Sequence, residues 1–83
     1  MENSLQIKNK IRQFIVETTY SPADQLKNDT QIFVQGIFDS MGFISLINFL
    51  EVAFAIKAKD SELIVDNFES IDAIASYVDR KLN

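Results

Sequence analysis

The chain passes from a long loop into its longest helix within residues 36–42, Gly36-Ile37-Phe38-Asp39-Ser40-Met41-Gly42. Asp39 and Ser40 are residue types preferred at a helix N-cap, because their side chains accept hydrogen bonds from backbone amides that lack a partner within the helix. Apolar residues follow at helical spacing, and this pattern predicts a helix from Ser40 to about Ile56. In most proteins capping alone would explain such an Asp-Ser pair.

The predicted helix is apolar on nearly every side. A turn of about 100° per residue gives a core stripe of Phe43, Leu46, Ile47, Phe49, Leu50, Ala53 and Phe54. The opposite side holds Met41, Ile44, Ser45, Asn48, Val52 and Ala55, with Glu51 at an edge. Such a helix is buried or makes a contact, and so short a chain can hardly bury it fully. We therefore interpret the face around Met41, Ile44 and Val52 as a partner-binding patch; the alternative is that a loop or a homodimer contact covers it.

Two further segments have helical periodicity. The first runs from Ser4 to about Thr18, with Asn3 or Ser4 as its cap, and Pro22 ends it because proline disfavours helical geometry at the preceding Ser21. The second runs from Ile71 to about Lys81 with Ser70 as its cap. Its apolar positions keep a three-four spacing: Ile71, Ile74, Ala75, Val78 and Leu82.

The remaining segments connect these helices. Residues 23–39 are predicted to form a long irregular connection, pinned across the core by Leu26, Ile32, Phe33, Ile37 and Phe38; a loop of this length usually has a function. A short helical turn is predicted over Glu62–Val65, with Phe68 as a plug in the core. The fold class is thus all-α: a small four-helix bundle with three main helices, one short helix and a long first loop, forming a single domain over residues 1–83.

The composition excludes several classes of function. The 83 residues include 8 Lys+Arg and 12 Asp+Glu, for a net charge of −4, and neither His nor Cys. A Ser-His-Asp or Cys-His catalytic device and a Cys-based zinc site are therefore impossible. The excess of acidic residues argues against nucleic-acid binding. Lys8, Lys10 and Arg12 are interpreted as a solvated helix face. The acidic residues from Asp60 to Glu69 lack the calcium-loop pattern, so no metal site is predicted. No membrane span or targeting segment is visible, and a soluble cytoplasmic protein is expected.

Ser40 could also have a chemical role. The unpaired amides and the dipole at a helix N-terminus favour a phosphate on its oxygen, which makes this serine a plausible acceptor of a phosphodiester. It is not a plausible self-activated nucleophile, since the chain has no His to take its proton. A small hydrolase that uses Asp39 and Glu51 is a poor hypothesis, because the sequence indicates neither a cleft nor a pair of carboxylates at a suitable spacing.

The sequence resembles the acyl carrier and peptidyl carrier proteins. Their signature is Asp-Ser followed by an apolar residue at the start of a long second helix, as in Asp39-Ser40-Met41. The resemblance extends over nearly the whole chain and includes Asp29-Thr30, Phe33, Ile44, Leu46, Ile47, Leu50, Glu51, Phe54 and the terminal Ile71-Asp72-Ala73-Ile74.

This resemblance implies a carrier without catalytic activity. Ser40 would accept 4'-phosphopantetheine from coenzyme A through a separate phosphopantetheinyl transferase, and the thiol of this arm would carry an acyl or aminoacyl group as a thioester. Other partners would be an acyl- or aminoacyl-activating ligase and acyl-transferring or synthase enzymes. Asp39 would flank the attachment site, Met41 would dock against the enzymes, and Ile44, Asn48 and Glu51 would lie on the recognition helix. A monomer is expected.

The chain departs from the fatty-acid carriers. It has Gly42, Ser45, Val52 and Ala53 where these carriers have acidic residues, so hydrophobic contact should weigh more in docking. The Asp-Ser-Met-Gly run is similar to D-alanyl carrier proteins and other free-standing carriers. The many aromatic residues, with Phe43 able to border a cavity, predict limited room for a long acyl chain. The rival hypothesis is an unmodified helical adaptor, in which Asp39-Ser40 only caps and the apolar face binds a fixed partner.

Overall fold

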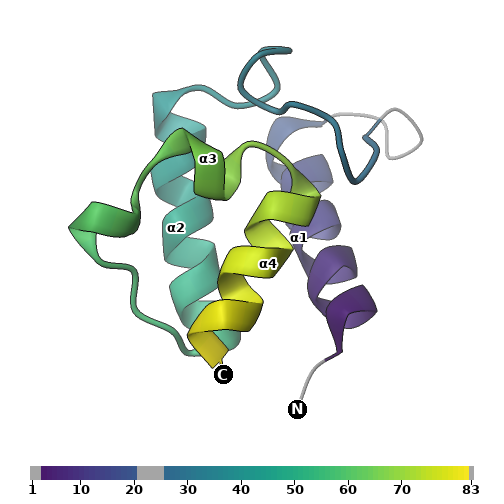
Figure 1. Ribbon diagram of the computed structural model, residues 1–83. Coiled ribbons are helices and arrows are strands. Elements are labelled where there is room, and N and C mark those ends of the chain that lie inside the picture. The colour runs from purple at the N-terminus through teal and green to yellow at the C-terminus, as the bar shows by residue number, and fades with distance from the viewer. Residues whose placement is uncertain (1–2, 21–25, 83) are drawn as a thin grey trace.

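The computed structural model describes residues 3–20 and 26–82, and within these residues all regular secondary structure is helical (Figure 1). In chain order the elements are α1 (Ser4–Thr19), α2 (Ser40–Phe54), the 3-10 turn η2 (Asp60–Glu62), α3 (Val65–Phe68) and α4 (Ile71–Leu82). The prediction of a small all-α bundle with three main helices and a long first loop is confirmed. No helix in the described part of the chain has the length and apolar character that a membrane crossing requires.

Helix α1 begins at the predicted place. Asn3 caps it, because its Oδ1 accepts a hydrogen bond from the Gln6 backbone N–H at 2.8 Å while the Gln6 side chain accepts one from the Asn3 N–H at 3.1 Å. The helix ends at Thr19, one residue later than predicted, and Tyr20 follows in the left-handed conformation with φ 57°. Ser21 and Pro22, on which the predicted end rested, lie outside the described residues.

The core lies where α1, α2 and α4 meet. Each helix buries one face there, with Ile7, Ile11 and Ile15 from α1, Leu46, Leu50 and Phe54 from α2, and Ile71, Ile74, Ala75, Tyr77 and Val78 from α4. Helix α4 is capped as predicted, since the Ser70 Oγ accepts a hydrogen bond from the Ala73 N–H at 3.1 Å. Helix α2 ends at Phe54 rather than Ile56, because Ala55 is left-handed with φ 54°. Ala53, assigned to the core stripe from the sequence, is exposed.

The described part of the long loop is tied to the helices. The Arg12 guanidinium on α1 donates hydrogen bonds to the Leu26 carbonyl and to the Asn28 side chain. The Asn28 carbonyl in turn accepts from the Asp72 N–H of α4 at 2.9 Å. The interpretation of Arg12 as part of a solvated face is therefore wrong: it clamps the loop that leads to α2, and its distant partners could not be read from local spacing.

The short helical turn predicted over Glu62–Val65 is displaced in the structure. The 3-10 turn ends at Glu62, and α3 starts only at Val65, with Leu63 and Ile64 between them. Phe68, the predicted core plug, is fully buried at the end of α3. The segment between α2 and α4 therefore has two short turns in place of one.

Candidate functional site

Asp39 and Ser40 have different roles at the start of α2. Asp39 is the N-cap, with extended backbone and with its Oδ1 accepting a hydrogen bond from the Gly42 N–H at 2.9 Å. Ser40 is the first helical residue; its side chain is exposed and makes no hydrogen bond to the described part of the chain. Capping by Asp39 thus leaves the Ser40 hydroxyl available to other molecules.

Two backbone amides beside this hydroxyl also lack an acceptor. The Gly42 N–H donates to the Asp39 side chain, and the Phe43 N–H donates to the Asp39 carbonyl at 3.0 Å. The N–H groups of Ser40 and Met41 have no acceptor within the described residues. Free amides at the positive end of a 15-residue helix favour an anion close to the Ser40 oxygen.

Gly42 fits the first turn of α2 closely against the loop. A Cβ at this position would lie 2.5 Å from the Cδ1 of Phe38, whose ring is buried. Glycine therefore lets the loop pack directly under the helix start and fixes where Ser40 emerges. This role was not predicted, although a glycine in the first turn of a predicted helix, two residues after Ser40, was a signal for it.

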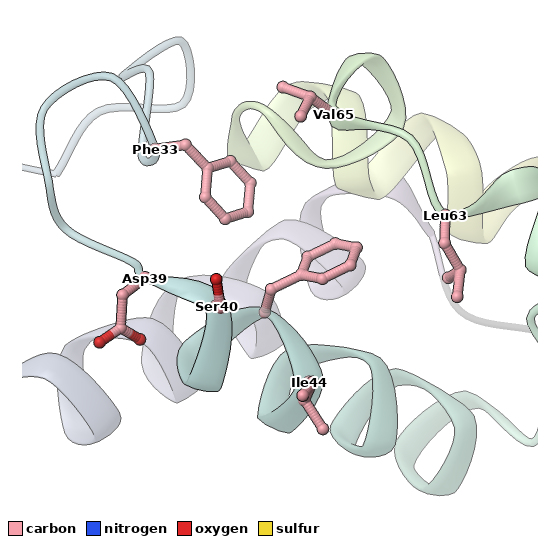
Figure 2. Close-up of a pocket in the computed structure, with 7 residues that line it drawn as sticks. Phe33, Asp39, Ser40, Ile44, Leu63 and Val65 are labelled. Atoms are coloured by element: carbon pink, nitrogen blue, oxygen red, sulfur yellow. The ribbon is translucent and has the colours of Figure 1, made fainter.

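An apolar hollow opens beside Ser40 (Figure 2). Its volume is about 450 Å³, and it is lined by Phe33, Asp39, Ser40, Phe43, Ile44, Leu63 and Val65. Figure 2 shows the Ser40 hydroxyl pointing toward the Phe33 ring, whereas the Asp39 carboxylate points away from this ring. Phe43, which from the sequence could border a cavity, lines this hollow while packing against the core.

Aromatic rings form a continuous row from this hollow into the core. The Phe33 and Phe43 ring centroids are 5.7 Å apart and nearly perpendicular. Phe43 meets Phe68 edge-on at 5.3 Å, and Phe68 meets Tyr77 at 4.9 Å. These spacings are those of packed aromatic pairs, so the row links the loop, α2, α3 and α4.

The predicted partner-binding residues lie at different places on α2. Met41, Ile44 and Val52 are 73%, 58% and 85% exposed, and Asn48 is exposed as well. Val52 is twelve residues from Ser40, about 18 Å along the helix axis, so only Met41 and Ile44 lie within about one helical turn of Ser40. Glu51 is half-buried, and its Oε2 accepts a hydrogen bond from the Ala58 N–H at 2.9 Å.

The structure adds two exposed apolar residues that the sequence analysis did not assign to a surface. Ile64 and Val65 are exposed at the start of α3, and Val65 lines the hollow together with Ile44 (Figure 2). The sequence signal for this surface was an apolar pair in a connection that is too short to bury both side chains. The apolar surface near Ser40 therefore includes both α2 and the start of α3.

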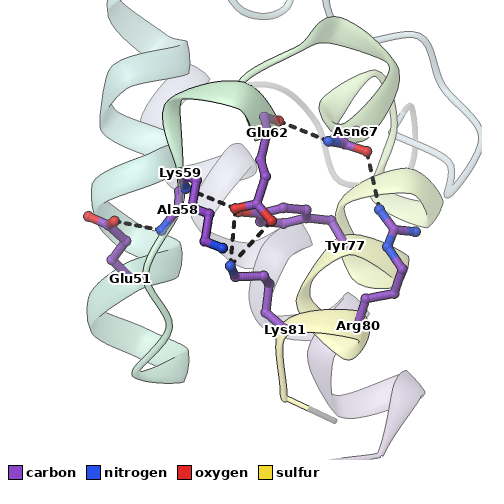
Figure 3. Close-up of polar contacts among 8 residues, drawn as sticks. All are labelled: Glu51, Ala58, Lys59, Glu62, Asn67, Tyr77, Arg80 and Lys81. Carbon is purple, nitrogen blue, oxygen red and sulfur yellow. Dashed lines mark hydrogen bonds and ion pairs between the residues drawn. The ribbon is translucent and has the colours of Figure 1, made fainter.

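Glu62 holds the segment that supplies Leu63 and Val65 to the hollow (Figure 3). Its Oε1 accepts hydrogen bonds from the Lys59 N–H at 2.8 Å, the Lys81 Nζ at 3.0 Å and the Tyr77 hydroxyl at 3.1 Å. The hydrogen bond from the Lys59 backbone, followed by the one from Lys81, lowers the pKa of Glu62 below its usual 4.5. The carboxylate thus anchors this wall to α4 in its charged form.

The surroundings of Tyr77 predict that the fold loses stability at alkaline pH. Burial, and then the hydrogen bond to Glu62, raise the pKa of Tyr77 from 10.0 to about 12. The unfolded chain releases this proton near pH 10, so the stabilising contribution is complete below pH 10 and is lost as the pH rises through 12. We expect the melting temperature to fall between pH 10 and 12.

Absorbance of the two tyrosines checks this expectation. One of them should ionise only as circular dichroism reports unfolding, and that late step should be missing in Tyr77→Phe. Ionisation of both tyrosines near pH 10 in a chain that stays folded would contradict the assignment.

The described residues provide an exposed hydroxyl, that of Ser40, and an apolar hollow beside it. They hold no group of three or more acidic side chains placed to bind a metal ion. A family model described as "Phosphopantetheine attachment site" matches residues 9–78 of the chain. Comparison with curated proteins gave no match.

Proposed function

Because the chain belongs to the family of phosphopantetheine attachment domains, we propose that Ser40 is the residue to which 4'-phosphopantetheine is attached. The family match covers residues 9–78 and supports a carrier in general. Within this range the structure describes Ser40, Ser45, Ser61, Ser70 and Ser76. Of these, Ser40 alone starts a helix of more than eight residues with its hydroxyl exposed, and this observation carries the assignment.

The surroundings of Ser40 fit such a group. Its Oγ would form the new bond to phosphorus while the bond from phosphorus to the nucleotide part of coenzyme A breaks, and the hydroxyl proton would pass to a base of the transferase. The free N–H groups of Ser40 and Met41 are placed to favour the phosphate charge. When bound, the group supplies the thiol that the chain itself lacks.

The protein then acts as a carrier of an acyl or aminoacyl thioester, and the chemistry belongs to its partners. These are a phosphopantetheinyl transferase, an activating ligase, and transferring or synthase enzymes. Docking uses the exposed apolar residues Met41, Ile44 and Val52, with Asn48 on the same face and Glu51 at its edge. A helix face without clustered charge supports contact by hydrophobic burial rather than by charge pairing. In this proposal the protein is a single carrier domain that acts as a monomer in the cytoplasm.

Mass spectrometry tests the attachment. The purified chain, incubated with coenzyme A and a broad-range phosphopantetheinyl transferase, should gain the mass of one phosphopantetheine group, and peptide mapping should locate it on Ser40. A folded chain that gains no mass would favour the rival hypothesis, an unmodified adaptor that uses the apolar face of α2.

The docking face is tested by Ile44→Asp. Ile44 is more than half exposed, so the melting temperature should change little, whereas a carboxylate in the interface should lower kcat/KM of the transferase about tenfold or more. Leu5→Asp is the matched control, since Leu5 is an exposed apolar residue on α1. Unfolding by Ile44→Asp, or equal effects of both variants, would contradict the assigned face.

A further inference from the structure

The hollow beside Ser40 has a floor made of aromatic rings. Phe43 is half-buried and lines the hollow, while Phe68 behind it is fully buried. The two rings meet edge-on at 5.3 Å, and Phe68 continues to Tyr77 at 4.9 Å. Rings at these distances are in packing contact. The Phe43–Phe68 pair therefore stands between the hollow and the buried residues of α4.

We propose that the Phe43–Phe68 contact closes the interior behind the hollow to long chains, so that the carrier accommodates an apolar acyl group that fits the hollow itself, such as a short branched chain or a single ring. The proposal rests on the proposed attachment at Ser40 and specifies the class of cargo. Phe43 is then the residue that determines chain length.

The lining of the hollow fits this class of cargo. Five of its seven residues have apolar side chains, Phe33 and Phe43 among them. A flat or short group can pack against these rings without moving them. A long unbranched chain would have to separate Phe43 from Phe68 and enter a close-packed core, or remain in water.

Acylated forms of the protein test the proposal. A broad-range transferase can load the arm together with its acyl group from acetyl-, benzoyl- and dodecanoyl-coenzyme A, and mass spectrometry confirms one group on each form. Failure to load any of them would count against the attachment at Ser40. Once loading is seen, the remaining measurements address only the length limit.

The melting temperature reports whether the acyl chain enters the protein core. Because each buried methylene adds stability, a dodecanoyl chain inside the core would raise the melting temperature by more than about 4 °C over the acetyl form. We expect these two forms to melt within about 2 °C of each other. We also expect NMR contacts from the benzoyl ring to the Leu63 and Val65 methyl groups. A large dodecanoyl shift, or the absence of those benzoyl contacts, would overturn the proposal.

Two alanine variants assign the limit to one ring. Phe43→Ala should gain the response that the wild type lacks, with its dodecanoyl form melting more than about 4 °C above its own acetyl form. Phe49→Ala is the matched control, because Phe49 is also half-buried on α2 but stacks on Phe14 at 4.3 Å, away from the hollow. If Phe43→Ala does not fold, Phe43→Leu replaces it with the same expected sign. A folded Phe43 variant without the gain would show that this ring does not set the limit.

Discussion

Replacing Ser40 by alanine should abolish the transferase-dependent mass gain completely and leave the fold intact. The loss is complete because the acceptor oxygen is removed. The fold should persist because Ser40 is exposed and makes no hydrogen bond in the described part of the chain. The cap of α2 is the Asp39 carboxylate, which this change does not touch. Mass spectrometry and thermal melts of the same sample measure both properties.

Asp39→Ala is the complementary variant. It removes the hydrogen bond to the Gly42 N–H, and loss of an N-cap of this kind costs about 0.5–2 kcal/mol, a fall of roughly 4–8 °C per kcal/mol in a domain of this size. Asp39→Asn keeps a capping oxygen and should melt close to the wild type. A Ser40→Ala protein that still gains one group would show that Ser40 is not the attachment site, and one that melts as low as Asp39→Ala would show that Ser40 contributes to the cap.

The three long helices could be predicted because their signals are local. A helix start depends on a side chain and an amide only three residues apart, as in Asn3 with Gln6 and Ser70 with Ala73. The buried faces follow from apolar spacing within each segment. These features therefore needed no knowledge of tertiary contacts.

The segment between α2 and α4 was predicted only in part, with Phe68 buried as expected but the turns misplaced, because distant residues shape it. Glu62 is fixed by Tyr77 and Lys81, fifteen and nineteen residues later in the chain. Arg12 finds its acceptors fourteen and sixteen residues later. No periodicity marks such pairs, so the displaced turn and the clamp on the loop emerge only from the folded chain.

The candidate site was predictable in part for the same reason. Asp39, Ser40 and Met41 are adjacent in sequence, and their place at a helix start follows from capping rules. Local rules left open whether Asp39 or Ser40 caps α2, because both residue types are good N-caps. The far wall of the hollow, Leu63 and Val65, comes from a separate segment and required the tertiary structure.

The most destabilising single change we expect is Phe68→Ala. Phe68 is the one buried residue of the four-residue α3, and its ring packs against both Phe43 and Tyr77. Truncation of a buried phenylalanine costs about 3–5 kcal/mol through lost burial and the cavity left behind. A chain of 83 residues has roughly 4–12 kcal/mol of stability in total, so this variant should be close to unfolding.

The effect should be strongest in the segment that forms the far wall of the hollow. The 3-10 turn contributes no buried residue, so Phe68 is the main apolar anchor between α2 and α4, and Glu62 is the main polar one. Denaturant unfolding measures the loss of stability, and hydrogen exchange of residues 56–69 locates it. Phe68→Leu keeps much of the buried volume and should cost less than half as much. Equal losses in the two variants, or unchanged exchange in this segment, would mean that other contacts hold the wall beside Ser40.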